Sequence, residues 1–232
     1  MDGELYLPYL QKCALFQGLD LDALHVILKA GRARRIRDGA IIFYQDQPAT
    51  TLYVLMRGRV KLTQVTADGQ QVLLRVAGPG EMFGVVAALG DALHPATAQV
   101  QGDCVVLGWR SEVVGELMER FPRLTLNALR FMAGRLREFQ DRYREMATER
   151  AERRIARTLL RLAGQLGRTV DEGVLIDLAL TRQDIAEMAG TTLFTVSRIL
   201  KAWEQQGLVK GGRERVLIRQ YAGLAAIAED SS

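Results

Sequence analysis

The 232-residue sequence contains only two cysteines and two histidines. Cys13 and Cys104 are too few for a disulfide scaffold, or for an iron–sulfur cluster held by the cysteines of one subunit, so both are expected to be free thiols. His25 and His94 cannot build a convergent histidine–carboxylate set, and the sequence has no metal-ligand spacing, nucleophile elbow or glycine-rich phosphate loop. These absences argue against an enzyme and against a metal centre.

Long apolar runs are also missing. None approaches the roughly 18 uninterrupted residues that a membrane-spanning helix needs. Residues 1–6 are acidic rather than basic and lack the order of a signal peptide. We therefore expect a cytoplasmic protein without a membrane partner. With 48% hydrophobic and 25% charged residues, the chain can bury the core of an ordinary globular protein.

Charge is distributed unevenly along the chain. The net charge of +4 is too small to indicate a nucleic-acid partner. Residues 1–120 carry 12 basic and 13 acidic side chains, whereas residues 121–170 carry 12 basic and five acidic ones. Residues 181–219 are also basic, with seven against four. A solvated helix face is the usual explanation of such runs, and charge alone does not displace it.

The N-terminal residues predict two short helices, Leu5–Leu15 and Asp20–Lys29. Asp20 can cap the second helix, in which three apolar residues share one face: Leu21, Leu24 and Leu28. The periodicity changes after Gly31, and the next helix restarts near Ser111.

Between these helices the sequence alternates β-rich runs with glycine corners. The runs are Ala40–Tyr44, Leu52–Met56, Val60–Val65, Val72–Val76 and Cys104–Trp109. Asp38-Gly39 and Asp68-Gly69 suit turns with positive φ, and further corners are expected at Gly58, Gly78 and Gly80. The pattern predicts an antiparallel barrel or jelly roll.

A long helix is predicted from Pro122 onward. Its apolar residues step by three and four positions, the a/d pattern of a coiled-coil seam: Leu129, Met132, Leu136, Phe139, Tyr143 and Met146. A helix packed only on its own domain normally has a wider stripe, so we favour a homodimer. Thr148, followed by acidic residues, is predicted to cap a new helix after a break near Ala147. The predicted domains are residues 1–120, 121–147 and 148–232.

The C-terminal residues begin with a predicted amphipathic helix and a short strand, Val174–Leu178. The helix directs four apolar residues inward: Ile155, Leu159, Leu162 and Leu166. Thr181 and Asp184 then form a capping-box pattern, and Gly190 ends the helix that they start.

A further helix and a hairpin complete this region. Thr192 can cap the helix, Gly207 can close it, and its inward residues are Val196, Ile199, Leu200 and Trp203. The stretch Val209–Ile218, with two glycines in its middle, predicts a hairpin. Two helices joined by a glycine turn and followed by a hairpin indicate a winged helix-turn-helix.

The exposed face of the last helix is predicted to contact DNA, because such a helix meets base edges with its N-terminal residues. The predicted contacts are Thr191, Thr192, Leu193, Phe194, Thr195, Ser197 and Arg198. Arg198 suits a bidentate contact with guanine, and Leu193 or Phe194 suits a thymine methyl group. Basic residues around the helix would neutralise phosphates, namely Arg182, Lys201, Arg213 and Arg215. A purely structural helix pair has the same spacing, but it leaves this polar face unexplained.

The whole chain resembles the cyclic-AMP receptor protein and fumarate-nitrate-reduction regulator (CRP/FNR) family of bacterial transcription factors. The similar segments are Gly58-Arg-Val-Lys61, Asp68-Gly69, Pro79-Gly80, Phe83-Gly84, Met132-Ala-Gly-Arg-Leu136 and Thr181–Lys201. The resemblance implies an α+β fold with a double-stranded β-helix of the cyclic-nucleotide-binding type, a long dimerisation helix and a winged helix-turn-helix. It also implies a homodimeric activator that binds palindromic promoter DNA, works with RNA polymerase and responds to an effector bound between the roll and the long helix.

The resemblance places an effector pocket at Phe83, Gly84, Val85, Val86, His94, Ala96, Thr97, Arg135 and Phe139. In members that bind cyclic nucleotides, a glutamate at the position of Val85 holds the ribose and an arginine near Pro95 holds the cyclic phosphate. Neither Val85 nor the His94-Pro95 pair can make those bonds, and Phe139 replaces the threonine that would meet adenine. Cyclic AMP is therefore not expected as the effector. The iron–sulfur cluster of other members is excluded, because Cys13 is the only cysteine near the N-terminus.

A further departure is Phe194, which stands where many members have a glutamate that accepts from cytosine, so the preferred half-site should differ. The segment Gly190–Arg198 is similar to regulators of nitrogen-oxide metabolism, some of which have been linked to haem and nitric oxide. Haem is therefore kept as an alternative, with the available ligands His25, His94, Met82 and Cys104. A packing or surface role is more common for a single histidine, and Cys104 is expected in the core. A regulatory subunit that binds a nucleotide but no DNA is a second alternative, and it leaves the recognition helix without a purpose.

Overall fold

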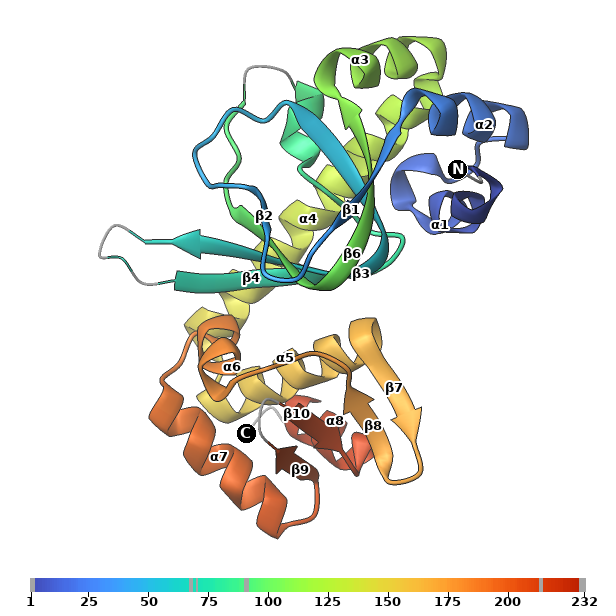
Figure 1. Cartoon of the computed structure of the whole chain (residues 1–232). Helices are drawn as coiled ribbons and strands as arrows, with labels where there is room; N and C mark the ends of the chain where they lie inside the picture. The colour runs from blue at the N-terminus through green and yellow to red at the C-terminus, as the bar shows by residue number, and fades with distance from the viewer. Residues whose placement is uncertain (1–2, 67–68, 70, 90–91, 213–214, 230–232) are drawn as a thin grey trace. The chain divides into compact units, whose positions relative to one another are not determined.

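The computed structural model describes residues 3–66, 69, 71–89, 92–212 and 215–229. The chain forms two compact units, residues 1–137 and residues 138–232 (Figure 1). The first unit is an antiparallel roll with helices, and the second combines helices with a small antiparallel sheet. One long helix, α4 (Pro122–Thr148), contributes residues to both units. The predicted α+β fold, with its roll, long helix and winged helix-turn-helix, is confirmed.

Antiparallel strands form the roll: β1 (Arg32–Ile36), β2 (Ile41–Phe43), β3 (Thr51–Val65), β4 (Gln71–Ala77), β5 (Met82–Phe83) and β6 (Thr97–Arg110). Their order is β1-β6-β3-β4, with β2 paired to β6 and β5 paired to β3. The long strands β3 and β6 pair from Thr51–Arg110 to Thr63–Thr97 and hold the roll together. A 3-10 helix, η3 (Val85–Leu89), follows β5.

Strand β3 is continuous where the sequence predicts two strands, Leu52–Met56 and Val60–Val65. Register shifts between Leu55 and Arg59 accommodate Gly58 inside the strand, so Gly58 does not form a corner between strands. Gly58 has a φ of +89°, and a Cβ there would clash with Cys104 Sγ and lie 2.7 Å from Asp103 O. A glycine is therefore needed for β3 and β6 to approach at this bulge.

The predicted helix Leu5–Leu15 is divided into η1 (Gly3–Tyr6), α1 (Leu7–Lys12) and η2 (Ala14–Phe16), because Cys13 has an extended backbone. The second predicted helix is confirmed as α2 (Leu21–Ala30). Its Asp20 cap accepts a hydrogen bond from Ala23 N at 2.8 Å. Leu21 is 56% exposed, and the buried residues of α2 are Ala23, Leu24 and Ile27.

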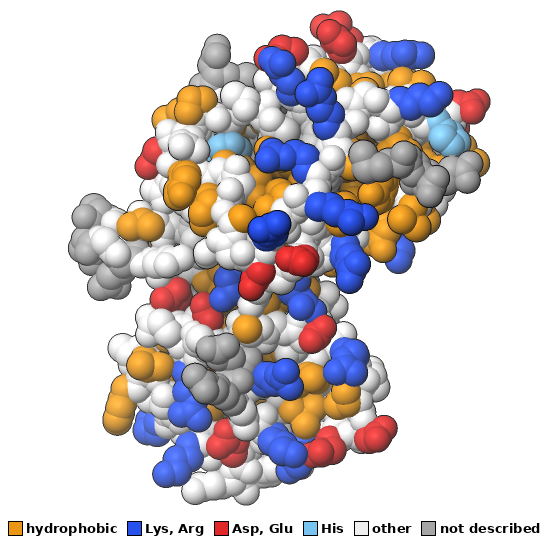
Figure 2. All heavy atoms as spheres, in the orientation of Figure 1, with side chains coloured by type: hydrophobic (Ala, Val, Ile, Leu, Met, Phe, Trp, Pro, Cys, Tyr) orange, Lys and Arg blue, Asp and Glu red, His pale blue; other side chains and the backbone are white. Residues whose placement is uncertain are grey.

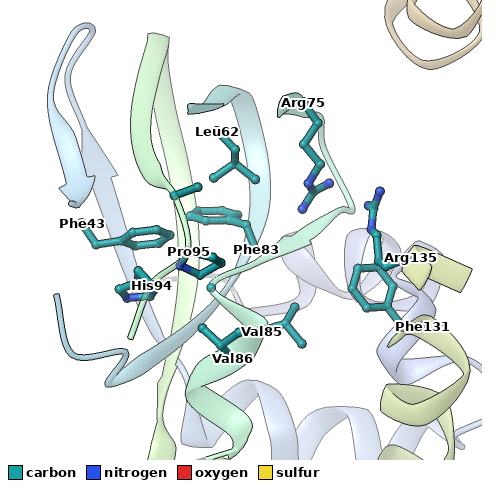
Figure 3. Close-up of a pocket in the computed structure, with 12 residues that line it drawn as sticks. Phe43, Leu62, Arg75, Phe83, Val85, Val86, His94, Pro95, Phe131 and Arg135 are labelled. Carbon is teal, nitrogen blue, oxygen red and sulfur yellow. The ribbon is translucent and has the colours of Figure 1, made fainter. Parts of the chain in front are cut away.

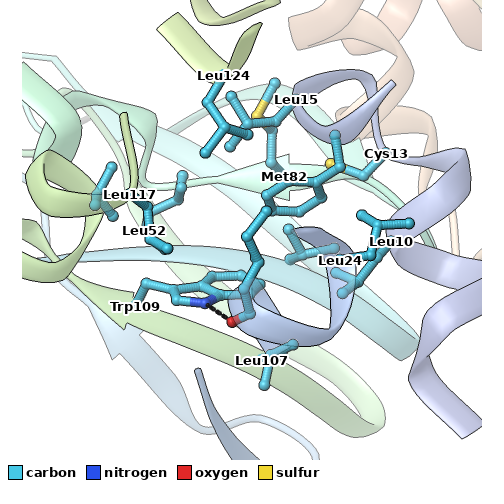
Figure 4. Packing of buried hydrophobic residues seen from close by; sticks show 14 of the residues in the cluster. Leu10, Cys13, Leu15, Leu24, Leu52, Met82, Leu107, Trp109, Leu117 and Leu124 are labelled. Atoms are coloured by element: carbon cyan, nitrogen blue, oxygen red, sulfur yellow. Dashed lines mark hydrogen bonds between the residues drawn. The ribbon is translucent and has the colours of Figure 1, made fainter. Parts of the chain in front are cut away.

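The N-terminal helices, α3 (Ser111–Arg120) and the start of α4 pack on the outside of the roll around an apolar cluster (Figure 4). Trp109, at the end of β6, is 1% exposed and donates from Nε1 to Ile27 O at 2.8 Å. The buried Asn127 of α4 donates from Nδ2 to Leu15 O at 2.9 Å and to Gln17 O at 2.8 Å. These bonds satisfy carbonyl groups that packing removes from water, and they tie the N-terminal segment to α4.

The second unit contains α5 (Ala151–Leu166), β7 (Gly167–Val170), β8 (Gly173–Ile176), α6 (Arg182–Ala189), α7 (Leu193–Gln205), β9 (Val209–Gly212), β10 (Arg215–Ile218) and α8 (Tyr221–Glu229). The sheet order is β7-β8-β10-β9. The predicted inward face of α5 and the predicted hairpin, now β9-β10, are both confirmed. Strand β7 and helix α8 were not predicted.

Helix α4 ends at Thr148 and α5 begins at Ala151, so a break lies close to its predicted position. The prediction that Thr148 caps the new helix is wrong. Its hydroxyl donates to Arg144 O at 2.9 Å within α4, and the residue before α5 is Arg150, which makes no side-chain cap bond. A threonine hydroxyl bonds a carbonyl four residues earlier as readily as it caps a helix, and here the first bond forms.

We predict that Asn127→Ala lowers the free energy of unfolding of the first unit by about 2 kcal/mol, because two buried carbonyls lose their donor. Urea denaturation followed by tryptophan fluorescence, to which Trp109 contributes, measures the change. Thr125→Ala, at an exposed position two residues earlier in α4, is the control and should change stability little. Equal stability of the two variants would contradict the assigned role of Asn127.

Candidate nucleic-acid interface and ligand cavity

The start of α6 is fixed by a reciprocal pair of bonds between Thr181 and Asp184. The backbone N of Thr181 donates to Asp184 Oδ2 at 2.8 Å, and the backbone N of Asp184 donates to Thr181 Oγ1 at 3.0 Å. Gly190 ends the helix with a φ of +60°. This capping box and this left-handed glycine confirm the predicted helix boundaries and set the turn into α7.

Arg154 of α5 braces that turn. Its guanidinium donates to Ala189 O at 2.8 Å, to Gly190 O at 3.0 Å and to Glu149 O. The first two acceptors are orphan carbonyls at the end of α6, and the third lies in the link between α4 and α5. One side chain therefore joins the α4–α5 link to the helix-turn-helix turn.

Other arginines of α5 hold the same link. Glu149 lies 3.4 Å from both Arg153 and Arg157, and Glu145 of α4 lies 3.3 Å from Arg161. The side chains of both glutamates are nearly buried. Part of the basic excess of residues 121–170 is thus internal to the second unit and is not available to a nucleic acid.

Helix α7 divides cleanly into a buried and an exposed face. The predicted inward residues Val196, Ile199, Leu200 and Trp203 are buried, and Trp203 Nε1 donates to Glu152 Oε1 at 3.0 Å. Thr192 caps the helix by accepting from Thr195 N at 3.2 Å. Of the predicted contacts, Thr192, Leu193, Phe194 and Arg198 are exposed, and Thr191, Thr195 and Ser197 are half-buried. Phe194, at 77% exposed, projects an aromatic ring into solvent at the start of the helix.

Basic side chains lie around this exposed start. Arg182 in α6, Arg198 and Lys201 are exposed, and none has a carboxylate partner among the described residues. Figure 2 shows basic and hydrophobic side chains next to one another over α7, at the lower left of the view. The arrangement combines positive charge with groups that can contact base edges.

The β9-β10 hairpin places further cations beside α7. Arg215 is exposed, and the predicted contact Arg213 lies outside the described residues. Lys210 and Arg219 both pair with Glu172, and these hydrogen bonds, with that of Arg219 the larger cause, hold the pKa of Glu172 below its usual value. Lys210 and Arg219 are therefore partly neutralised within the protein, unlike Arg198 and Lys201.

The a/d residues of α4 form an apolar stripe that the chain itself does not cover. Leu129, Met132, Leu136, Phe139, Tyr143 and Met146 are 41–66% exposed. The opposite side of the first half of the helix buries Leu124 in the apolar cluster outside the roll and bonds the N-terminal segment through Asn127. The stripe is therefore a second apolar face of the same helix, separate from the one that packs in the core.

A cavity of about 160 Å³ lies in the first unit, between the roll and the beginning of α4 (Figure 3). Its lining residues are Phe43, Leu62, Arg75, Phe83, Gly84, Val85, Val86, His94, Pro95, Ala96, Phe131 and Arg135. Seven of the predicted pocket residues are among them. Thr97 and Phe139 are not; the Thr97 hydroxyl accepts from Gln45 N at 3.0 Å, and Phe139 belongs to the second unit.

His94 is the buried histidine of this cavity. It is 3% exposed and stacks on Phe43 with ring centroids 3.6 Å apart and planes 6° from parallel. Its Nδ1 has no hydrogen-bond partner among the described residues, and burial lowers the pKa of the imidazole. The ring is therefore neutral near pH 7.

Two family models match the chain, a cyclic nucleotide-binding domain at residues 33–121 and a Crp-like helix-turn-helix domain at residues 153–227. The cyclic AMP receptor protein of Thermus thermophilus is 32% identical over 92% of this chain and 96% of its own length. This chain belongs to the CRP/FNR family of transcription regulators.

Other similar proteins support the same family assignment. The transcriptional activator protein anr of Pseudomonas aeruginosa is 26% identical over 90% of this chain and 84% of its own. The structure of FixK2 from Bradyrhizobium japonicum matches with a TM-score of 0.73 and 24% identity, covering 87% of this chain and 99% of that one, which shows a common fold. The domains and relatives are those of a DNA-binding transcription regulator and not of an enzyme.

Four lining residues of the cavity were missed by sequence reasoning: Phe43, Leu62, Arg75 and Phe131. They come from β2, β3, β4 and α4, so only the strand pairing and the packing of α4 bring them together. The sequence contained a signal for Arg75, because it is the one charged residue in the apolar strand Gln71–Ala77. A charged side chain within such a strand usually has a specific partner or role.

The remaining residues weighed as haem ligands are not among the residues that line the cavity. His25 is half-buried in α2, Met82 is buried in the cluster outside the roll, and Cys104 is buried inside the roll with Sγ 3.1 Å from Arg59 O. The other thiol, Cys13, is fully buried, and desolvation raises its pKa to about 12. Both cysteines are free and occupy core positions.

The described residues contain no group of three or more His, Cys, Asp and Glu side chains placed to hold a metal ion. None of their helices has both the length and the apolar character that crossing a bilayer requires.

We predict that Arg154→Gln lowers the free energy of unfolding of the second unit by about 2 kcal/mol and weakens DNA binding, because the turn before α7 loses its charged donor. Calorimetric unfolding and fluorescence anisotropy with duplex DNA measure the two effects. Arg168→Gln, an exposed arginine of β7, removes the same charge and is the control. A DNA affinity lowered equally in both variants would mean that only net charge matters.

Proposed function

We propose that this CRP/FNR protein is a homodimeric, sequence-specific transcription activator that binds palindromic promoter DNA and recruits RNA polymerase. The observation that carries the proposal is the exposed first half of α7, held by Arg154 and surrounded by Arg182, Arg198 and Lys201. The relatives named a cyclic AMP receptor protein and a transcriptional activator support the same class of function.

The DNA contacts follow from the faces of α7. The exposed Arg198 would make a bidentate bond to guanine, while the exposed Leu193 and Phe194 offer apolar surface for a thymine methyl group. Lys201, Arg182 and Arg215 would contact phosphates and set the register without selecting sequence. Because Phe194 cannot accept a hydrogen bond from cytosine, the half-site differs from that of members with glutamate at this position.

The homodimer is supported by the apolar stripe of α4. Six large apolar side chains at a/d spacing are exposed in the single chain, and an exposed stripe of this size is a docking surface for another helix. A second copy of the same stripe is self-complementary, and a two-fold dimer matches a palindromic site.

An effector other than cyclic AMP is proposed to control the dimer. Val85 and Pro95 present no donor or acceptor side chain to the cavity, so ribose and cyclic phosphate lack the groups that hold them in cyclic-nucleotide-binding members. An effector in this cavity would touch the roll and α4 together. It would thereby favour one arrangement of the long helices and shift the population of DNA-binding dimers.

The residues do not fit the haem alternative. His94 is locked against Phe43, and neither His25, Met82 nor Cys104 is among the lining residues that could supply a second axial ligand. A cavity of about 160 Å³ also matches one small ring better than a porphyrin. A regulatory subunit that does not bind DNA would leave the exposed cations of α7 without a role.

We predict that Leu136→Glu converts the dimer to a monomer at micromolar concentration, because a buried charge would face its own copy across the seam. Sedimentation velocity measures the mass. Arg137→Glu, an exposed residue off the stripe, makes a larger change in charge and should leave the dimer intact. A dimer that persists in Leu136→Glu would place the interface elsewhere.

We predict that Arg198→Ala reduces the preference for a target site over random duplex by about 10- to 100-fold, the value of one bidentate base contact. The target is a palindromic site selected from a randomised duplex library with the unaltered protein, and binding is followed by fluorescence anisotropy. Lys201→Ala is the matched control, because loss of a phosphate contact weakens both duplexes alike and lowers the salt dependence by about one unit. Undiminished selectivity of Arg198→Ala would refute the assigned contact.

A further inference from the structure

The cavity in the first unit is apolar along most of its wall and cationic at one side. Its apolar wall includes Phe43, Phe83 and Val85, and its charged lining residues are Arg75 and Arg135. No acidic residue is among the described residues that line it. Figure 3 shows Phe43 and His94 on one side and the two arginines on the other, with Phe83 between them. This polarity fits an occupant with an apolar body and one anionic end.

Both arginines are held in place before any ligand arrives. The guanidinium of Arg135 lies over the ring of Phe131, 4.9 Å from its centroid. Arg75 Nη2 donates to Met82 O at 2.7 Å, and its Nη1 is 3.5 Å from Glu81 Oε2, a long ion pair with a partly exposed partner. The side chain of Arg75 is 17% exposed. A planar guanidinium that packing and a backbone bond orient is suited to a carboxylate, which it can bind through two parallel hydrogen bonds.

At the other side of the cavity, His94 has an unused hydrogen-bonding atom. Its Nδ1 is buried without a partner among the described residues, while the ring stacks on Phe43. Buried polar atoms are rarely left unpaired, so this nitrogen indicates a group that completes it. Because burial lowers the pKa of His94, the neutral ring can either accept from a ligand or donate to it.

The cavity has room for one ring. A volume of about 160 Å³ is close to the roughly 150 Å³ apolar cavity known to hold a benzene molecule. Aromatic walls from Phe43, Phe83 and Phe131 favour a flat ring.

We propose that the cavity binds a monocyclic aromatic carboxylate with one polar ring substituent. The carboxylate lies between Arg75 and Arg135, the ring packs against Phe83, and the substituent bonds to His94 Nδ1. This inference deepens the proposed function, because it names the chemical class of the effector that the regulator would sense.

Isothermal titration calorimetry of the full-length protein tests the proposal, with 4-hydroxybenzoate and 4-aminobenzoate as probes. We expect saturable binding of one molecule per chain. Benzamide, which keeps the ring but lacks the charge, should bind at least tenfold more weakly than benzoate. Acetate, which keeps the charge but lacks the ring, should neither bind nor compete at the same concentration.

Three variants separate the contacts. Arg75→Gln and Arg135→Gln should each weaken the binding of both carboxylates at least tenfold, whereas Arg130→Gln, an exposed arginine of α4, should not. Because Arg75 also bonds Met82 O, thermal unfolding checks that its variant folds, and Arg75→Lys should keep part of the affinity through charge alone. His94→Phe retains the stacking surface, so it should reduce 4-hydroxybenzoate binding about fivefold and leave benzoate binding unchanged.

Several outcomes would overturn the proposal: no heat with either probe, equal binding of benzamide and benzoate, competition by acetate, or saturable binding of cyclic AMP at the same site. DNA selectivity is measured separately on the same preparation. Selective DNA binding without ligand binding defeats this inference and leaves the proposed function standing. Ligand binding by a protein that is indifferent to DNA sequence defeats the proposed function and supports the cavity.

Discussion

The rest of the structure depends on the long helix α4, which has one apolar face packed inside the first unit and another that is exposed. One side packs within the first unit, where Leu124 and Asn127 are buried and Phe131 and Arg135 line the cavity. Another side carries large apolar residues that remain exposed in one chain. A helix that buries one apolar face and exposes a second one keeps a docking surface when the chain is alone. Any molecule in the cavity thus touches the same helix that offers the apolar stripe.

The end of that helix is tied to the recognition element by charge. Arg154 satisfies carbonyls of both the α4–α5 link and the α6–α7 turn, and Glu149 in the link pairs with Arg153 and Arg157. These partners are largely buried, so salt screens them less than it screens surface pairs. The link therefore transmits the position of the last turns of α4 to α6 as one piece within the second unit. Salt that weakens the proposed phosphate contacts of Arg182 and Lys201 should leave this internal connection intact.

Local signals made the second unit predictable, whereas the cavity needed the tertiary fold. Thr181, Asp184, Gly190 and Thr192 act within four residues of their own positions, so their sequence spacing was enough to place α6 and α7. Thr148 failed as a cap because a competing bond within α4 was equally local and equally satisfied by its hydroxyl. Gly58 was misplaced because the decisive contact is with Cys104, 46 residues away on a paired strand. Arg75 and Phe131 meet in the cavity for the same long-range reason, and no periodicity in either segment could reveal it.

The lining of the cavity shows how the polar groups of a roll can change without a new fold. The family resemblance identifies Val85 and the His94-Pro95 pair as the positions where cyclic-nucleotide-binding members carry a glutamate and an arginine, and neither a carboxylate nor a guanidinium stands there in this chain. Arg135, which the resemblance also places in the effector pocket, keeps one positive charge on the α4 side of the wall. Arg75 adds a second guanidinium from β4. A charged side chain at a fixed position selects both the charge and the orientation of a ligand. An arginine on β4, in place of one in the segment before β6, therefore changes which molecules fit. The strand pairing stays the same.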